Sequence, residues 1–237
     1  MLDATHVPID SSRGTRRLKS TLESISRSLM TLRTNRELTL TPNASSSAAL
    51  LQGVEMADIQ ALMEENPSLR GYVQGYLAEL MLKRNLIEKG IVAKIDKIPD
   101  RDALKGDLLL DYKGVPITIE VKSLATASVK EDILNETWEG TVLVKNTDRK
   151  LREVEGIGTI NATNLIKGEF DILAICCFAV TGQWDFAFME SRYLPESDDF
   201  PGFVKTRFLV NPYNTPGLTH DCEKVLESIY RQKQSSR

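Results

Sequence analysis

The 237-residue sequence is poor in the residues that build disulfide frameworks and histidine-based metal sites. It has three cysteines, of which Cys176 and Cys177 are adjacent in an apolar run and Cys222 stands alone. This spacing matches neither a disulfide framework nor a Cys-x-x-Cys metal knuckle, so reduced thiols are expected. The two histidines, His6 and His220, lack metal-ligand spacing to each other or to a cysteine, and we interpret both as solvated.

Long hydrophobic runs are also missing. The longest run, residues 172–180, is far too short to cross a bilayer. The first 30 residues include several basic side chains and no apolar stretch of the kind found in secretory signals. A cytoplasmic protein without a membrane partner is therefore expected. The composition, 41% hydrophobic and 27% charged, is that of an ordinary globular chain long enough to bury its own core.

The sequence has no overall excess of positive charge. Its formal net charge is -3, which by itself does not favour a polyanionic partner. The charge is unevenly distributed, because residues 11–36 contain seven basic residues and one acidic residue. Apolar residues recur in this segment at helical spacing, which predicts an amphipathic helix with a basic opposite face. Such a helix either packs on the core or contacts DNA or another partner.

The chain is expected to divide near residue 66. Residues 1–66 are predicted to form an N-terminal helical, partly basic segment, with a loop at 39–47 and a second helix at 48–65. Residues 67–237 are predicted to form an α/β core with a C-terminal extension. That core begins with a helix at 69–89, which we expect Ser68 to cap and Gly90 to end.

Strand and helix patterns alternate through the rest of the chain. Residues 91–95 alternate as a short strand, and a polar turn follows at 96–105. Strands at 106–112 and 116–124 are joined by Lys113-Gly114, a short turn with the glycine that hairpins favour. The remaining expected elements are helices at 128–137 and 161–167, strands at 170–180 and 184–189, and a last helix at 221–231.

Three polar residues of the predicted hairpin are candidates for chemistry. Side chains alternate between the two faces of a strand, so Glu120 and Lys122 point to the same side. If the turn lies between Gly114 and Val115, Asp107 is opposite Lys122, and cross-strand neighbours are about 5 Å apart. Two carboxylates and one ammonium group are therefore predicted to converge.

This set of groups suits Mg²⁺, with Mn²⁺ as a substitute. Mg²⁺ binds a few carboxylates together with water and phosphate oxygens, so Asp107, Glu120 and the backbone carbonyl of Val121 would suffice. A bound ion polarises a phosphodiester and lowers the pKa of an attacking water, while Lys122 orients that water or offsets charge in the transition state. The predicted reaction is phosphodiester hydrolysis. The alternative is an exposed salt-bridge ladder, which contributes little stability.

The same residues resemble the PD-(D/E)xK nuclease superfamily, in which an Asp opens one strand and Glu-x-Lys lies on the next. The matching segments are Gly-Asp107-Leu-Leu-Leu and Ile-Thr-Ile-Glu120-Val-Lys122-Ser. The resemblance implies a restriction endonuclease-like α/β fold, with a mixed central β-sheet flanked by helices. It also implies an acidic residue on the preceding helix, where Glu79 stands. The literal Pro-Asp pair ends at Asp100, but it lies in a polar turn outside the hairpin, so Asp107 is preferred.

The resemblance implies a Mg²⁺-dependent DNA endonuclease. A type II restriction enzyme acting on duplex DNA as a homodimer is one form, because two symmetric sites cut two strands. A structure-selective resolvase or repair nuclease would use the same site equally well. The alternative outside enzymes is a nucleic-acid-binding or scaffold protein that keeps the fold without catalysis.

Overall fold

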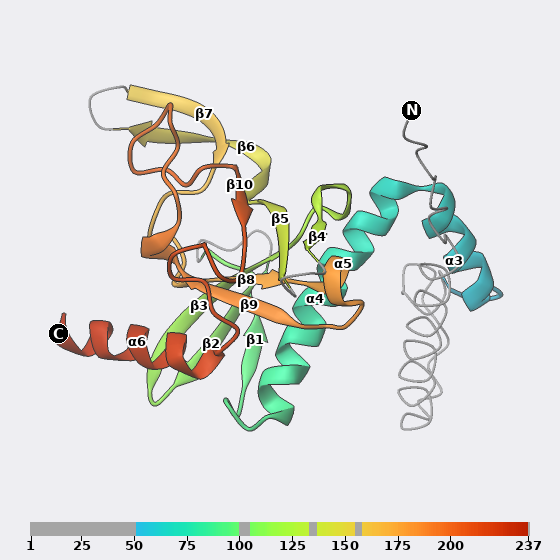
Figure 1. Ribbon diagram of the computed structural model, residues 1–237, viewed down its shortest axis with the longest axis horizontal. Helices are drawn as coiled ribbons and strands as arrows, with labels where there is room; N and C mark the ends of the chain where they lie inside the picture. The colour runs from blue at the N-terminus through green and yellow to red at the C-terminus, as the bar shows by residue number, and fades with distance from the viewer. Residues whose placement is uncertain (1–50, 100–104, 133–136, 155–157, 237) are drawn as a thin grey trace, which may run out of the picture. The chain divides into compact units, whose positions relative to one another are not determined.

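The computed structural model describes residues 51–99, 105–132, 137–154 and 158–236 (Figure 1). The predicted basic helix at 11–36 lies outside these ranges. Of the second predicted helix, the described part is α3, Met56–Glu65. Residues from Gly71 to the C-terminus form one compact unit, whose fold is described below. A division of the chain near residue 66 stays a prediction.

Helix α4, Pro67–Glu88, confirms the helix predicted at 69–89. It buries one stripe of small and branched residues spaced four apart, namely Ala78, Leu82 and Leu86. The helix begins one residue before Ser68, so the prediction that Ser68 caps it is wrong. Pro67 takes the first position because proline has no N–H to leave unpaired there. Gly90 follows the helix with φ 69°, the left-handed conformation that ends helices.

The central sheet has five strands in the order β1-β2-β3-β8-β9. Their bounds are Ile95–Lys97, Leu108–Tyr112, Val115–Ser123, Ile172–Cys176 and Phe186–Glu190. Only β3 and β8 run parallel in this sheet, and the other neighbours are antiparallel. Because helices α4 and α6, Cys222–Ser235, pack against it, the mixed α/β class with a mixed sheet flanked by helices is confirmed.

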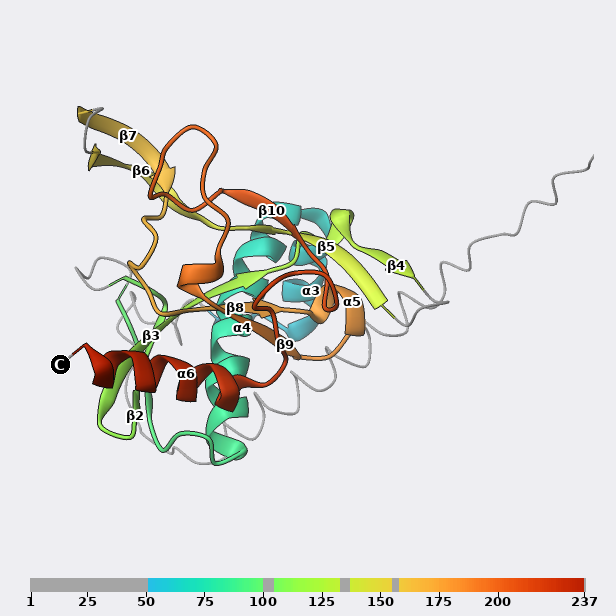
Figure 2. The same cartoon turned by 60° about the vertical axis from the view of Figure 1, so that its left-hand side comes forward.

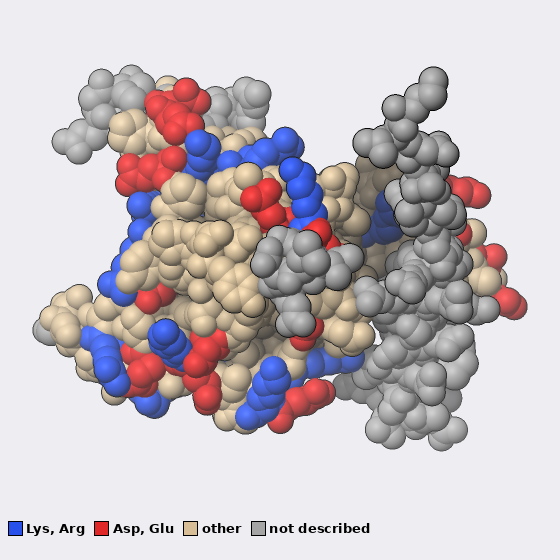
Figure 3. Space-filling view, in the orientation of Figure 1, with Lys and Arg blue, Asp and Glu red and all other residues tan. Residues whose placement is uncertain are grey.

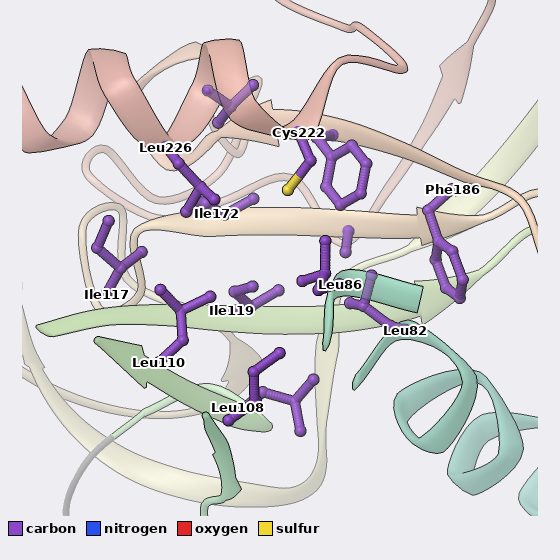
Figure 4. Close-up of a cluster of buried hydrophobic side chains, with 14 of the residues drawn as sticks. Leu82, Leu86, Leu108, Leu110, Ile117, Ile119, Ile172, Phe186, Cys222 and Leu226 are labelled. Atoms are coloured by element: carbon purple, nitrogen blue, oxygen red, sulfur yellow. The ribbon is translucent and has the colours of Figure 1, made fainter. Parts of the chain in front are cut away.

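Two hydrophobic cores lie on the two faces of the sheet. In the first, Ile117 and Ile119 of β3 meet residues of α4 and α6, as Figure 4 shows. In the second, Leu173 and Ile175 of β8 meet residues of β5, Thr137–Leu143, and β10, Arg207–Val210. Figures 1 and 2 show α6 on one side of β8 and β9, and β5 with β10 on the other. Every residue of β8 is buried, as its apolar sequence predicts.

The chain between β3 and β8 differs from the prediction. Helices were expected at 128–137 and 161–167, but both expectations are wrong. The described residues there form a short 3-10 turn and then four strands, β4 Lys130–Asp132, β5, β6 Lys145–Val154 and β7 Gly158–Asn164. In β5 buried and partly exposed residues alternate, with Trp138 and Val142 inward. This period of two is that of a strand packed on one face.

Two further elements end differently from their predictions. The strand expected at 170–180 stops at Cys176, and Phe178–Thr181 forms the short helix α5. The last helix, predicted at 221–231, is α6, which ends four residues later, at Ser235. Asp221 caps it, and its carboxylate accepts the Lys224 N–H at 3.0 Å. Across the part of the chain described, no helix is both long and apolar enough to span a membrane.

Candidate active site

The turn of the β2–β3 hairpin is Lys113-Gly114, as predicted, but its centre lies one residue earlier than the predicted register assumed. Tyr112 pairs with Val115, so only Lys113 and Gly114 form the turn. Both have positive φ, 54° and 79°, as a type I′ turn requires. The centre expected between Gly114 and Val115 is therefore wrong.

Moving the centre of the turn by one residue shifts the register of the two strands by two residues. Leu109 lies opposite Thr118 rather than Glu120. A shift of two residues, unlike a shift of one, leaves every side chain on its predicted face. Asp107 consequently precedes the paired part of β2 and lies beside β3 near Val121 rather than opposite Lys122.

Asp107 is held at this place by its own backbone and side chain. Its N–H donates to the Ile119 carbonyl at 2.8 Å, and its Oδ2 accepts the Val121 N–H at 2.7 Å. The last backbone pair of β2 and β3 is Leu108 with Ile119, and the Asp107 carboxylate adds one more hydrogen bond to β3 beyond it. Gly106 makes the approach possible, because its φ is 106° and an added Cβ would lie 3.1 Å from the Ile119 oxygen.

Glu120 and Lys122 lie on the same face of β3, as their spacing predicts. Lys122 Nζ is 2.5 Å from Glu120 Oε1. Glu120 is only 8% exposed, which distinguishes this pair from ion pairs on a protein surface. Burial raises the pKa of Glu120, and the nearby Asp107 raises it further while Lys122 opposes the rise. For Lys122, burial acts to lower the pKa, but the charges of Glu120 and Asp107 outweigh it and the pKa is raised.

Glu79 projects from α4 to the same group of charges. Its Oε2 is 2.6 Å from Lys97 Nζ, and Lys97 Nζ is 3.7 Å from Asp107 Oδ1. Burial raises the pKa of Glu79 against the opposing hydrogen bond from Lys97, and Asp107 adds to the rise. The resemblance placed an acidic residue on this helix, and the structure brings Glu79 near Asp107 through Lys97.

The sequence interpretation did not include Lys97. It assigned residues 96–105 to a polar turn, whereas Lys97 ends the edge strand β1. Strand β1 begins at Ile95, so the strand predicted at 91–95 is wrong except for its last residue. The buried residues Ile95 and Ile98 are three apart, so they do not give the period-two pattern by which a strand is recognised. Asp100, the rejected alternative to Asp107, lies outside the described residues.

The carboxylates fit a cation that needs few protein ligands. Within the described ranges no three His, Cys, Asp or Glu side chains are arranged to hold a metal. A cage of three carboxylates is therefore not formed, and Lys97 and Lys122 neutralise the acidic groups instead. Mg²⁺ requires only one or two carboxylates besides water. Asp107 and Glu120 can provide them. The Val121 N–H donates to Asp107, and the Val121 carbonyl points to the same side of β3 as that N–H.

Among the described residues, neither His220 nor the cysteines form a metal-binding group with these carboxylates. His220 is exposed, as predicted, and its Nδ1 lies 3.0 Å from the Phe186 carbonyl. His6 falls outside the described residues. All three cysteines are buried free thiols.

Comparison with known proteins gives limited information. No protein-family model and no curated protein matches the chain. Among solved structures, a bacterial homing endonuclease matches over 70% of this chain and 96% of its own, with 17% identity and a TM-score of 0.37. At these values the match assigns neither a family nor an activity to the chain.

Proposed function

We propose that this chain is a Mg²⁺-dependent nuclease that hydrolyses phosphodiester bonds in DNA. The observation that supports the proposal best is the buried Glu120–Lys122 pair beside Asp107, at one end of the β2–β3 hairpin. An acidic pair with an adjacent ammonium group suits phosphodiester hydrolysis around a hard cation.

Burial argues against the alternative of a salt-bridge ladder on the surface. Removing two charges from water costs several kcal/mol per ion, as an order of magnitude, and their attraction offsets this only in part. Among the described residues, the ion pairs of this cluster join the carboxylates of Glu79, Asp107 and Glu120 to Lys97 and Lys122. The raised pKa values of Glu79 and Glu120 reflect this burial. Such perturbed groups cluster at functional sites.

Each residue has a role in the proposed reaction. Asp107, Glu120 and the Val121 carbonyl would hold the cation, which when bound polarises the phosphodiester and lowers the pKa of a water. Lys122, fixed by Glu120, would donate hydrogen bonds to the attacking water or to a phosphate oxygen. Glu79, which lies on the other side of Lys97 from Asp107, would add negative charge that strengthens binding of the cation.

More specifically, we propose that the chain acts as a homodimer that cuts duplex DNA, as type II restriction enzymes do. One site on each chain cuts one strand, so a symmetric pair is needed for both strands. On the face shown in Figure 3, basic and acidic side chains are intermixed, with no continuous basic stripe among the described residues. The basic segment at 11–36 would then provide phosphate contacts, as its sequence suggests.

A cleavage assay with matched variants tests the proposal. Supercoiled plasmid, linear duplex and a branched junction are each incubated with the protein and Mg²⁺. Cleavage should fall by roughly 100-fold or more in Glu120→Gln and in Lys122→Met. Asp111→Asn is the control, because Asp111 lies on β2 and only accepts the Gly114 N–H in the turn, which an amide oxygen also accepts.

The substrate that is cut distinguishes the forms of the proposal. Cleavage of both strands of linear duplex supports the restriction enzyme, and cleavage restricted to the junction supports a resolvase or repair nuclease. Full activity in Glu120→Gln would refute the site. DNA binding without cleavage in the unmodified chain would identify a non-catalytic protein instead.

A further inference from the structure

The ammonium group of Lys97 lies where two carboxylates of the candidate site face each other. It is 2.6 Å from Glu79 Oε2 on one side and 3.7 Å from Asp107 Oδ1 on the other. The two acidic side chains come from segments far apart in sequence, α4 and the start of β2. A single ammonium group from the edge strand therefore lies against both carboxylates.

The two oxygens of Asp107 have different partners. Oδ2 accepts the Val121 N–H, a hydrogen bond that holds the end of β2 against β3. Oδ1 faces Lys97, and it is the oxygen that remains for a divalent cation. An ammonium group and a metal ion therefore compete for the same carboxylate oxygen.

We propose that Lys97 is a tethered competitor of the divalent cation. Its ammonium neutralises Glu79 and Asp107 when the site holds no metal, and it withdraws from Asp107 Oδ1 when a metal binds. This inference rests on the proposed metal-dependent function. In this inference Lys97 sets the affinity of the site for the divalent cation, although Lys97 is neither a metal ligand nor a catalytic group.

The side chain of Lys97 is suited to move. It is 37% exposed, whereas that of Glu79 is 15% exposed, so the lysine is the partner with access to solvent. Lysine holds its charge on a flexible four-carbon stem. The Tyr76 ring centroid is 5.8 Å from Nζ and offers the displaced ammonium an aromatic face. Leaving Asp107 therefore does not require the ammonium to leave the region.

Lys122 and Lys94 provide the contrasts. Lys122 is bound to Glu120, is less exposed at 23%, and belongs to the proposed catalytic machinery. Lys94 lies three residues before Lys97 and pairs at 2.8 Å with Asp96, with both side chains largely exposed. Replacing Lys94 removes the same charge nearby without touching Glu79 or Asp107. Lys94→Met is thus the matched control for Lys97→Met.

The experiment is a calorimetric titration of the full chain with Mn²⁺ in the absence of DNA. Lys97→Met and Lys97→Gln should each bind Mn²⁺ about fivefold or more tightly than the unmodified chain, a coupling of ordinary size. Lys94→Met should bind with unchanged affinity. In EDTA the Lys97 variants should melt at a lower temperature, and Mn²⁺ should raise their melting temperature by more than it raises that of the unmodified chain.

The possible outcomes separate this inference from the proposed function. Unchanged or weaker Mn²⁺ binding in both Lys97 variants, with circular dichroism showing them folded, overturns the competitor role. Equal tightening in Lys94→Met overturns it too, because a general surface field would then explain the effect. No Mn²⁺ binding by any protein overturns the metal dependence itself. Tightened binding without DNA cleavage supports Lys97 as competitor and counts against the nuclease.

Discussion

Asp107 and Val121 are joined by a 2.7 Å hydrogen bond from the Val121 N–H to the Asp107 carboxylate. This contact ties the end of β2 to the part of β3 that carries Glu120 and Lys122. One oxygen of Asp107 thus has a structural role and the other is available to a cation. The two roles can be separated by mutation.

Asp107→Asn should keep the fold and lose the metal, because the amide oxygen still accepts the Val121 N–H but carries no charge. Asp107→Ala should lose both, and an unpaired backbone N–H costs about 1–3 kcal/mol of unfolding free energy. Urea unfolding and Mn²⁺ titration measure the two effects. Equal stability of the two variants would contradict the structural role of this hydrogen bond.

The Glu120–Lys122 pair should show strong coupling in a double-mutant cycle. Glu120→Gln leaves a buried ammonium without its counter-charge, and Lys122→Met leaves a buried carboxylate, so each should cost about 3–5 kcal/mol. The double variant should be more stable than the sum of the single effects predicts, because neither charge remains unpaired. The measurement is urea unfolding at neutral pH. Additive effects would show that the two side chains act independently.

Glu79 should make the metal-free protein more stable as the pH falls toward the pKa of this group. Burial raises the Glu79 pKa in the folded state above its ordinary value of 4.5, so the folded chain takes up the proton before the unfolded chain does. The resulting stability is present at low pH and is lost as the pH rises through the folded pKa.

Glu79→Gln should flatten this pH dependence, because the amide does not titrate. The check is the unfolding free energy in EDTA at several pH values from neutrality down toward 4.5. The same slope in both proteins would show that other groups cause it. Glu64→Gln is the control, since Glu64 is an exposed residue of α3 that accepts a hydrogen bond from Gln60.

How far the sequence could predict this site is clear from particular residues. The shared face of Glu120 and Lys122 follows from the strand period alone, and the structure confirms it. The partner of Asp107 could not be predicted, because register depends on the number of residues in the turn. Lys113 adopts a positive φ that non-glycine residues rarely take, and this conformation centres the turn between Lys113 and Gly114 rather than between Gly114 and Val115.

The connection from β3 to β8 was harder to predict. Parallel strands usually connect through a helix, which favoured helices at 128–137 and 161–167. The described residues are strands instead, and β5 is stabilised by packing Trp138 and Val142 into the second core. The alternation of apolar and polar residues in β5 was a local signal for a strand, but the strands that it pairs with, β4 and β10, cannot be read from that pattern. Lys97 was missed for a related reason, since edge strand β1 is only three residues long.

The three thiols should be inert in the folded protein. Burial raises the pKa of Cys176 to about 11 and those of Cys177 and Cys222 to about 12. The thiolate is the reactive form, so near pH 8 the raised pKa lowers its fraction roughly 100-fold for Cys176 and roughly 1000-fold for Cys177 and Cys222. A colorimetric thiol reagent should detect all three groups in urea and almost none without it. Rapid reaction of the native protein would contradict the buried positions.

Gly106 should be the glycine whose replacement most affects the site. Its φ of 106° strains any L-residue, and a Cβ would lie 3.1 Å from the Ile119 oxygen that accepts the Asp107 N–H. Gly106→Ala should therefore cost about 1–3 kcal/mol of stability and weaken Mn²⁺ binding, because Asp107 must shift. Gly114 has a φ of 79°, but nothing lies within 4 Å of an added Cβ. Gly114→Ala should therefore strain the backbone of the turn without displacing Asp107. Equal loss of Mn²⁺ affinity in both variants would mean that backbone strain, and not the placement of Asp107, controls the site.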